Sequence, residues 1–228
     1  MLIFRRSYCY VIGRDGKGTR RERPLTSCRL THPKAGPSMK TLIDQLVCEV
    51  RRVNPGVLAK LRPGLPRSAV QEKLSALPFE ITPDAVALYE WADGSESGLF
   101  ELLPGGFFIP LSEALEEFWI LHPCRDEFES LFHQPYRDCI RFLSDWSDAG
   151  YAFGRCDSPS AGKIVSLCIH APWRLAFADL EALLITAIEC YRRGVFPIGG
   201  SREAPDIDRY FRIGAEVNPA MDWATSDG

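Results

Sequence analysis

The chain has 228 residues, of which 46% are hydrophobic and 25% are charged, and its formal net charge is −3. These values are ordinary for a globular protein, and the length allows one domain or at most two around a substantial core. The sequence gives no indication of a membrane-spanning helix, because no apolar run approaches the ~20 residues that such a helix needs.

Residues 1–38 are basic, with nine Lys or Arg against two acidic residues, a net charge of +7. Two interpretations remain open: an arm that touches nucleic acid or a partner, or a disordered or non-native extension with Met39 as the true start. We favour the second, because an amphipathic helical pattern begins directly after Met39. Met1–Arg6 carries its charge after its apolar stretch, the reverse of a secretory signal, so we expect a cytoplasmic protein.

Residues 39–228 are acidic, with 18 Lys or Arg against 28 Asp or Glu, a net charge of −10. A surface of this sign prefers cationic partners. Nucleic acid is disfavoured as a ligand of this part of the chain, because phosphate binding requires clustered Lys and Arg.

Helical patterns dominate the first half of this acidic region. Leu42, Leu46, Val50 and Val53 recur at helical spacing, and Asn54-Pro55-Gly56 ends the pattern. A second, short helix is expected over 68–77. A third begins at Thr82, a good N-cap residue, with Pro83 and Asp84 in its first turn.

Asp93-Gly94 is expected to stop that third helix, because Gly adopts a left-handed C-cap conformation at no steric cost. Two short apolar strands should follow. A further helix then opens at Leu111, with an apolar stripe formed by Leu115, Phe118 and Trp119.

The centre of the chain is rich in strand patterns, over 139–176, with a turn at 157–162. Residues 177–193 form the longest predicted helix, which ends at Arg192-Arg193-Gly194. One face of this helix is lined by Leu180, Leu183, Leu184, Ala187, Ile188 and Tyr191. Residues 197–223 are polar and turn-rich, and we expect the tail 197–228 to fold back on the domain. The predicted architecture is a single α+β domain over 39–228, a mixed or antiparallel sheet with helices packed around it.

The sequence offers little catalytic or metal-binding chemistry. The segment Gly94–Gly98 has Glu96 where a serine-hydrolase elbow has its nucleophile. The eight cysteines include no Cys-x-x-Cys pair, the four histidines are scattered singly, and Asp206-Ile207-Asp208 lacks the Gly and distal Glu of a calcium loop. We interpret the cysteines as small buried hydrophobic residues and the acidic triplet as a solvated turn. We therefore expect no enzyme activity, no cofactor and no metal.

Several weak motifs occur in an order that resembles the SUKH superfamily, the Smi/Knr type of domain found in bacterial immunity proteins and fungal cell-wall regulators. The likeness covers about residues 41–223. The matching positions are Leu88, Trp91, Asp93-Gly94, Leu99–Leu103, Leu111–Ala114, Ile140–Leu143, Gly150–Phe153, Cys156-Asp157, Gly162–Val165, Asn218-Pro219 and Asp222-Trp223. Asp93 stands where that family usually has Asn, and an Asp-Gly turn serves the same geometry.

The resemblance implies a non-enzymatic protein-binding domain, and specifically an immunity protein that occludes a cognate basic toxin such as a nuclease. A regulatory scaffold of the fungal type is the alternative. From the acidic loops we predict a partner-binding surface. Its predicted members are Asp93, Glu96, Glu101, Asp145, Trp146, Asp148 and Asp157. Two interpretations of Trp146, which stands between acids, remain open: an aromatic anchor for the partner, or an edge residue covered by the C-terminal tail. We predict no membrane partner, and the sequence leaves the oligomeric state open.

Overall fold

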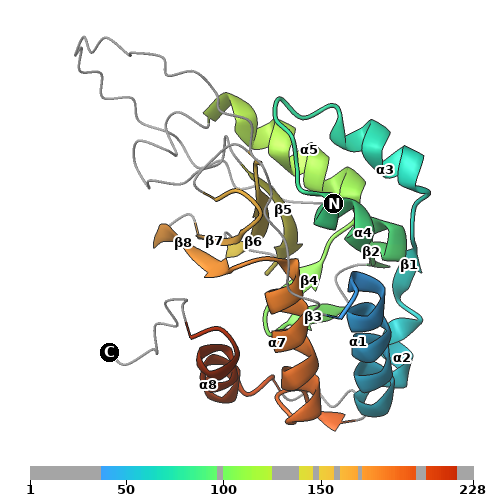
Figure 1. Cartoon of the computed structure of the whole chain (residues 1–228), viewed down its shortest axis with the longest axis vertical. Coiled ribbons are helices and arrows are strands. Elements are labelled where there is room, and N and C mark those ends of the chain that lie inside the picture. Colours follow the sequence, from blue (N-terminus) through green and yellow to red (C-terminus); the bar gives the residue numbers. More distant parts are fainter. Residues whose placement is uncertain are drawn as a thin grey trace, which may run out of the picture. The chain divides into compact units, whose positions relative to one another are not determined.

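A six-stranded antiparallel sheet, in which every strand pairs with its neighbour in sequence, organises the fold (Figure 1). The computed structural model describes residues 37–96, 100–124, 139–145, 149–156, 160–168, 171–198 and 204–219. The strands of this sheet, in order, are β3 (Glu101–Leu103), β4 (Gly106–Phe108), β5 (Cys139–Ser144), β6 (Ala149–Gly154), β7 (Ile164–Cys168) and β8 (Ala171–Phe177).

A second, two-stranded sheet pairs β1 (Leu61–Pro63) with β2 (Ala92–Ser95). The helices are α1 (Met39–Val53), α2 (Pro55–Leu58), α3 (Arg67–Leu74), α4 (Pro83–Trp91), α5 (Leu111–Leu121), α7 (Leu180–Arg192) and α8 (Ile207–Val217), with a 3₁₀ turn η2 (His122–Cys124). The described residues belong to one compact unit that spans Lys34–Gly228. The α+β class predicted from the sequence is therefore confirmed, with antiparallel pairing throughout the described sheets.

Local sequence explains the two principal helices. Ser38 Oγ accepts the Thr41 N–H at 3.2 Å to cap α1, and Asp179 Oδ1 accepts the Ala182 N–H at 2.8 Å to cap α7. The predicted apolar stripes of both helices are buried. Gly194, with φ 71°, follows the end of α7 as predicted. The prediction that α7 is the longest helix is wrong, because α1 has 15 residues and α7 has 13.

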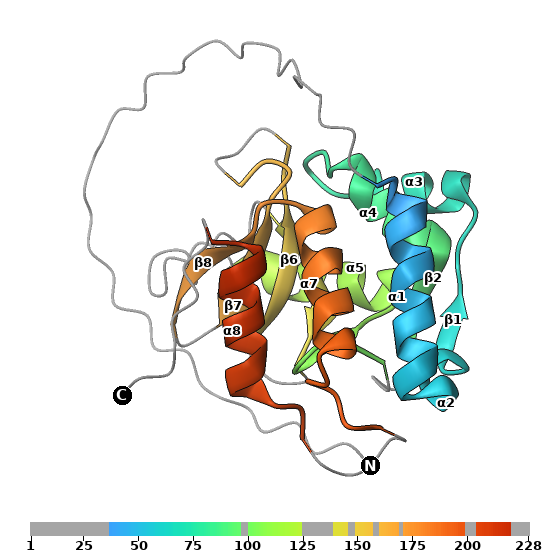
Figure 2. The ribbon, with the colours of Figure 1, turned by 60° about the horizontal axis from the view of Figure 1, so that its bottom comes forward.

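One face of the sheet carries the main core. Figure 2 shows α8, α7 and α1 as a row of neighbouring helices beside the sheet. Large aromatic side chains fill the space beneath, and the Phe142 and Phe153 rings stack with centroids 4.1 Å apart. Arg141, between Ile140 and Phe142, points to the opposite face, where it forms an ion pair with Glu117 of α5. Helix α5 therefore lies on the other side of β5 from α7.

Helix α8 was not predicted, and it replaces the expected turn-rich segment after residue 197. Asp206 Oδ1 accepts the Arg209 N–H at 2.9 Å, so the acidic triplet that we interpreted as a solvated turn is a helix start. In its described part this segment packs on the domain: Tyr210 and Ile213 are buried, and the Asn218 side chain donates to Thr186 Oγ1 at 2.7 Å. The signal was present in the sequence, because Ile207, Tyr210, Phe211 and Val217 recur at helical spacing after the N-cap residue Asp206, and the prediction overlooked it.

Candidate functional site

Asp93 is the first predicted partner-binding residue, and the structure buries it. Its Oδ1 atom accepts the Leu111 N–H at 2.9 Å, and its Oδ2 atom lies 3.6 Å from Arg62 Nη2. Helix α5 begins after Pro110, which offers no side-chain cap, so Asp93 caps this helix from a different part of the chain. With only 6% of its surface exposed, Asp93 holds the fold together and is not available to a partner; we remove it from the predicted surface.

Gly94 also acts differently from the prediction. Helix α4 ends at Trp91, and its C-cap residue Ala92 is extended, so Gly94 does not stop the helix. Its φ is 71°, and a Cβ at this position would lie 2.3 Å from Pro110 N and 2.4 Å from the Ile109 carbonyl carbon. Gly94 therefore allows two backbone segments to cross in contact. At the other end of α4, Thr82 occupies the N-cap position as predicted, without a capping bond from its side chain.

Three predicted acids lie close to one end of strands β3–β5, and we call Glu96, Glu101 and Asp145 the strand-end acids. In the sheet register, Glu101 pairs with Phe107, which pairs with Ser144, the residue before Asp145. Two strand spacings separate Glu101 from Ser144, or about 10 Å. Glu96 follows Ser95, whose hydroxyl donates to Phe108 O at 3.0 Å and accepts the Phe100 N–H at 3.4 Å. Long-range pairing thus gathers residues far apart in sequence.

The strand-end acids differ in their surroundings. Glu96 is exposed, whereas Glu101 and Asp145 are half-buried. Burial raises the pKa of the Glu101 carboxyl, an effect that a hydrogen bond from the Gly105 backbone partly offsets. Asp145 Oδ1 accepts the Ala149 N–H at 3.1 Å and so also holds the β5–β6 connection. Glu96 is therefore the member best placed to meet a partner.

The remaining predicted members, Trp146, Asp148 and Asp157, lie outside the described residues. Among the described residues, Cys156 and Ser160 follow the end of β6 opposite to Ala149 and Asp145. The Cys156 N–H donates to Glu80 O at 3.0 Å, which ties that end of the sheet to the segment before α4.

An additional polar and apolar surface, which the sequence analysis missed, lies along α5. We define the α5 outer face as Glu113, Glu116, Trp119 and Ile120, all of them exposed. Trp119 was predicted to pack inside, but it is 44% exposed, and its neighbour Ile120 is 66% exposed. The buried side of the helix consists of Leu111, Ala114 and Phe118. Of the predicted stripe, Phe118 is buried and Leu115 is half-buried, while Trp119 lies outside the buried side.

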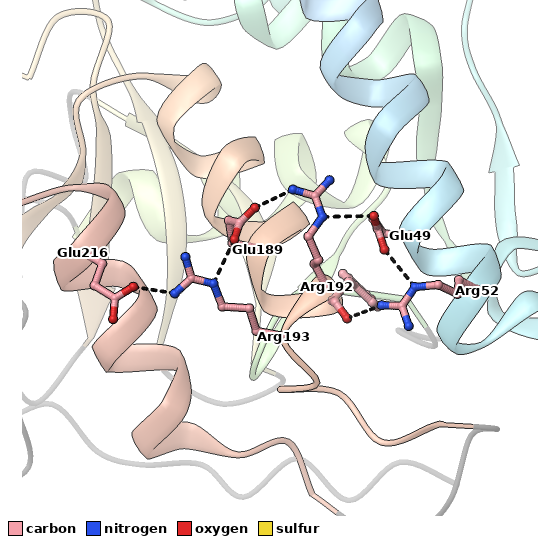
Figure 3. A network of polar contacts seen from close by, with 7 residues as sticks. Glu49, Arg52, Glu189, Arg192, Arg193 and Glu216 are labelled. Carbon is pink, nitrogen blue, oxygen red and sulfur yellow. Dashed lines mark hydrogen bonds and ion pairs between the residues drawn. The ribbon is translucent and has the colours of Figure 1, made fainter.

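Figure 3 shows a network of ion pairs that connects α1, α7 and α8. Glu49 bonds Arg52 at 2.9 Å and Arg192 at 3.1 Å, and Glu189 bonds Arg192 at 2.6 Å and Arg193 at 2.8 Å. Arg193 also pairs with Glu216 of α8. The hydrogen bond from Arg52 lowers the pKa of Glu49, with Arg192 contributing. Because these acidic and basic side chains pair with one another, we interpret the network as a structural connection between the helices.

A shallow hollow of ≈ 710 Å³ lies between α3 and the start of α4. Its lining is mixed: Leu74, Leu77, Phe79 and Ile81 are apolar, and Arg67 and Glu80 contribute polar groups. Among the described residues, no three His, Cys, Asp or Glu side chains gather as metal ligands would. Five cysteines in those ranges are free thiols, and burial raises the pKa of the Cys190 thiol to about 12.

Comparison with protein-family models and with curated proteins yields no match for this chain. None of the helices in the described ranges has the length and apolar character needed to cross a membrane.

Proposed function

We propose that this protein is a non-enzymatic protein-binding domain that works as an immunity protein in the cytoplasm. It would bind a basic toxin domain, such as a nuclease, and occlude its active surface without any chemical step. The observation that carries the proposal is the gathering of the strand-end acids at one end of the sheet, in a region whose net charge is −10. The resemblance to the SUKH superfamily points the same way.

Charge of this kind has a physical consequence for binding. Complementary fields steer two proteins together, and they raise association rates toward ~10⁸–10⁹ M⁻¹s⁻¹ at low salt. An inhibitor that must reach its toxin before the toxin reaches its target benefits from a fast encounter. Glu101, already half-buried and with a raised pKa, would become more favourably ionised beside a partner's Lys or Arg.

A regulatory scaffold of the Smi/Knr type is the second candidate. The observation in its favour is that the strand-end acids and the α5 outer face are separate candidate contact regions on different elements. A scaffold would use such regions for several partners of modest affinity.

The experiment that tests the first proposal is capture of partners from the native host by the full chain, at low and moderate salt. We expect one stoichiometric basic protein that is toxic when expressed alone and harmless when co-expressed with this chain. Several weakly held proteins without toxicity would support the scaffold instead. Capture of an acidic toxin would contradict the electrostatic argument.

A charge reversal then tests the surface. Glu96→Lys should slow association with the captured toxin by about tenfold at low salt, with less effect at high salt, because it reverses the field at the contact. Glu72→Lys, an equally exposed change on α3, is the matched control. Equal association rates for the two variants, measured by surface plasmon resonance, would remove the strand-end acids from the interface.

A further inference from the structure

Helix α5 presents apolar surface to solvent at a position where its sequence would have been expected to bury it. Trp119 and Ile120 are 44% and 66% exposed, and they are two of the four large hydrophobic residues that remain exposed among the described residues. The other two, Ile198 in the segment after α7 and Ile207 at the start of α8, are not adjacent in sequence. Adjacent exposed apolar side chains in a monomer often mark a contact surface.

The Trp119 ring is held in place from below. Its centroid lies 5.2 Å from that of Phe118, which is buried, and 4.9 Å from that of His122. Phe118 in turn meets Phe79 edge-on at 5.6 Å. An aromatic side chain that is supported in this way loses little conformational entropy on binding, which is a property of interface anchors.

The charged residues of the α5 outer face, beside Trp119 and Ile120, are both acidic. Glu113 and Glu116 lie on the same side of α5, with Glu116 one turn before Trp119 and Ile120. Neither carboxylate forms an ion pair with any residue in the described ranges, whereas Glu117, on the inner side, is paired with Arg141. A cation placed over the Trp119 ring would therefore lie close to two acidic groups, and the ring face itself attracts cations.

We propose that the α5 outer face is a docking surface for a basic protein segment that presents Lys or Arg next to an apolar side chain. The apolar side chain would cover Trp119 and Ile120, while the cations would meet Glu113 and Glu116. The proposal rests on the proposed function for the identity of the natural partner, but the chemistry of the surface can be tested without that partner.

The probe is a synthetic amphipathic helix of Leu and Lys, titrated into the full chain and followed by isothermal calorimetry. A Leu/Glu helix and a Ser/Lys peptide of equal length test the charge and the apolar requirement. We expect binding of the Leu/Lys helix alone. Trp119→Ala, Ile120→Ser and the pair Glu113→Lys with Glu116→Lys should each weaken it by about tenfold or more, as for interface anchors.

Matched controls keep the result specific. Ile198→Ser removes an exposed apolar residue elsewhere, and Glu72→Lys with Asp208→Lys makes the same change in net charge on α3 and α8. Both controls should leave the affinity of the Leu/Lys helix unchanged within twofold, as surface changes outside an interface do. Equal losses in the controls, or no loss in the α5 variants, would overturn the proposal. Ile120→Ser remains decisive if Trp119→Ala, which loses ring contacts, fails to fold.

Two further outcomes separate this inference from the proposed function. If a captured toxin binds the α5 variants as tightly as the parent chain, the immunity proposal stands and the docking surface does not. If the peptide result holds but no toxin is found, the surface stands and the immunity proposal fails. Concentration-dependent self-association that Trp119→Ala abolishes, measured by analytical ultracentrifugation, would assign the surface to a second copy and overturn the basic partner.

Discussion

At the scale of single residues, Asp93 and Gly94 show how one short motif joins two parts of the chain. Asp93 caps α5 across 18 positions of sequence, and Gly94 lets β2 pass against the backbone of Ile109 and Pro110. An Asn at position 93, which the resembled family usually has, would also present a carbonyl oxygen to the Leu111 N–H. The motif thus connects two segments of the fold. The residues around it gave no sign that the Asp93 carboxylate would be buried.

Gly94→Ala is expected to destabilise the protein by about 2–5 kcal/mol, because the added Cβ combines a left-handed φ with overlap of fixed backbone atoms. Gly105→Ala is the matched control: its φ is 72°, but nothing lies within 4 Å of a Cβ built there. The control should lose only about 1–2 kcal/mol, from the conformation alone. Urea unfolding of both variants measures the difference, and similar losses would show that the chain crossing at Gly94 relaxes freely.

At the scale of elements, the docking of α8 on α7 and β6 completes the helical layer. Tyr210 and Tyr151 share a hydrogen bond between their hydroxyls at 2.8 Å, and Arg209 donates to Arg193 O and Gly194 O at 3.1 Å. The bond to Asn218 and the ion pair of Arg193 with Glu216 lie at the other end of the helix. Polar groups therefore hold both ends of α8, with Tyr210 and Ile213 buried between them.

The hydroxyl pair predicts a non-additive mutant cycle. Tyr151→Phe and Tyr210→Phe should each lower the free energy of unfolding by about 1–2 kcal/mol. Each change removes the hydrogen-bond partner of the buried hydroxyl on the other tyrosine. The double variant should cost less than the sum of the two, since both polar groups are then gone. Thermal or urea unfolding of the four proteins gives the coupling energy. Strict additivity would mean that the two hydroxyls do not depend on each other.

At the scale of the whole molecule, four tyrosines on different elements share one electrostatic condition. Burial raises the pKa of the Tyr89, Tyr151, Tyr191 and Tyr210 hydroxyls above their ordinary value of 10.0. Tyr191 also donates to Glu101 O at 2.6 Å, which links α7 to β3. Folding therefore keeps these hydroxyls protonated at a pH where the unfolded chain releases their protons.

Stability should consequently fall as the pH rises above about 10, because the unfolded state then binds fewer protons than the folded state. Each tyrosine lowers the free energy of unfolding by up to about 1.4 kcal/mol per pH unit in that range, and does not change it with pH below that range. Urea unfolding at a series of alkaline pH values, with tyrosinate absorbance as a second probe, measures the slope. The Tyr210→Phe variant should show a shallower slope, and a pH-independent stability up to pH 11 would contradict the burial of these groups.

Part of the fold and of the candidate surface could be predicted from local patterns. The stripes of α1 and α7, the position of α4, the strand-rich centre and the α+β class depend on neighbouring residues, and they agree with the structure. The exposure of Trp119 did not follow, because it depends on which distant surface α5 meets. Helix α8 carries local signals, helical spacing and an Asp cap, that the prediction overlooked.

The sequence by itself determined the buried stripes of α1 and α7, the start of α4, and that residues 39–228 are acidic, since each property belongs to adjacent residues or to a sum over them. Only the tertiary structure decided which acidic residues are neighbours and which of them are exposed to a partner. Strand register placed Glu101 close to Asp145, and the crossing at Gly94 buried Asp93 against Leu111. The physical reason is that hydrogen bonding and burial act between positions distant in sequence, where no local pattern records the contact.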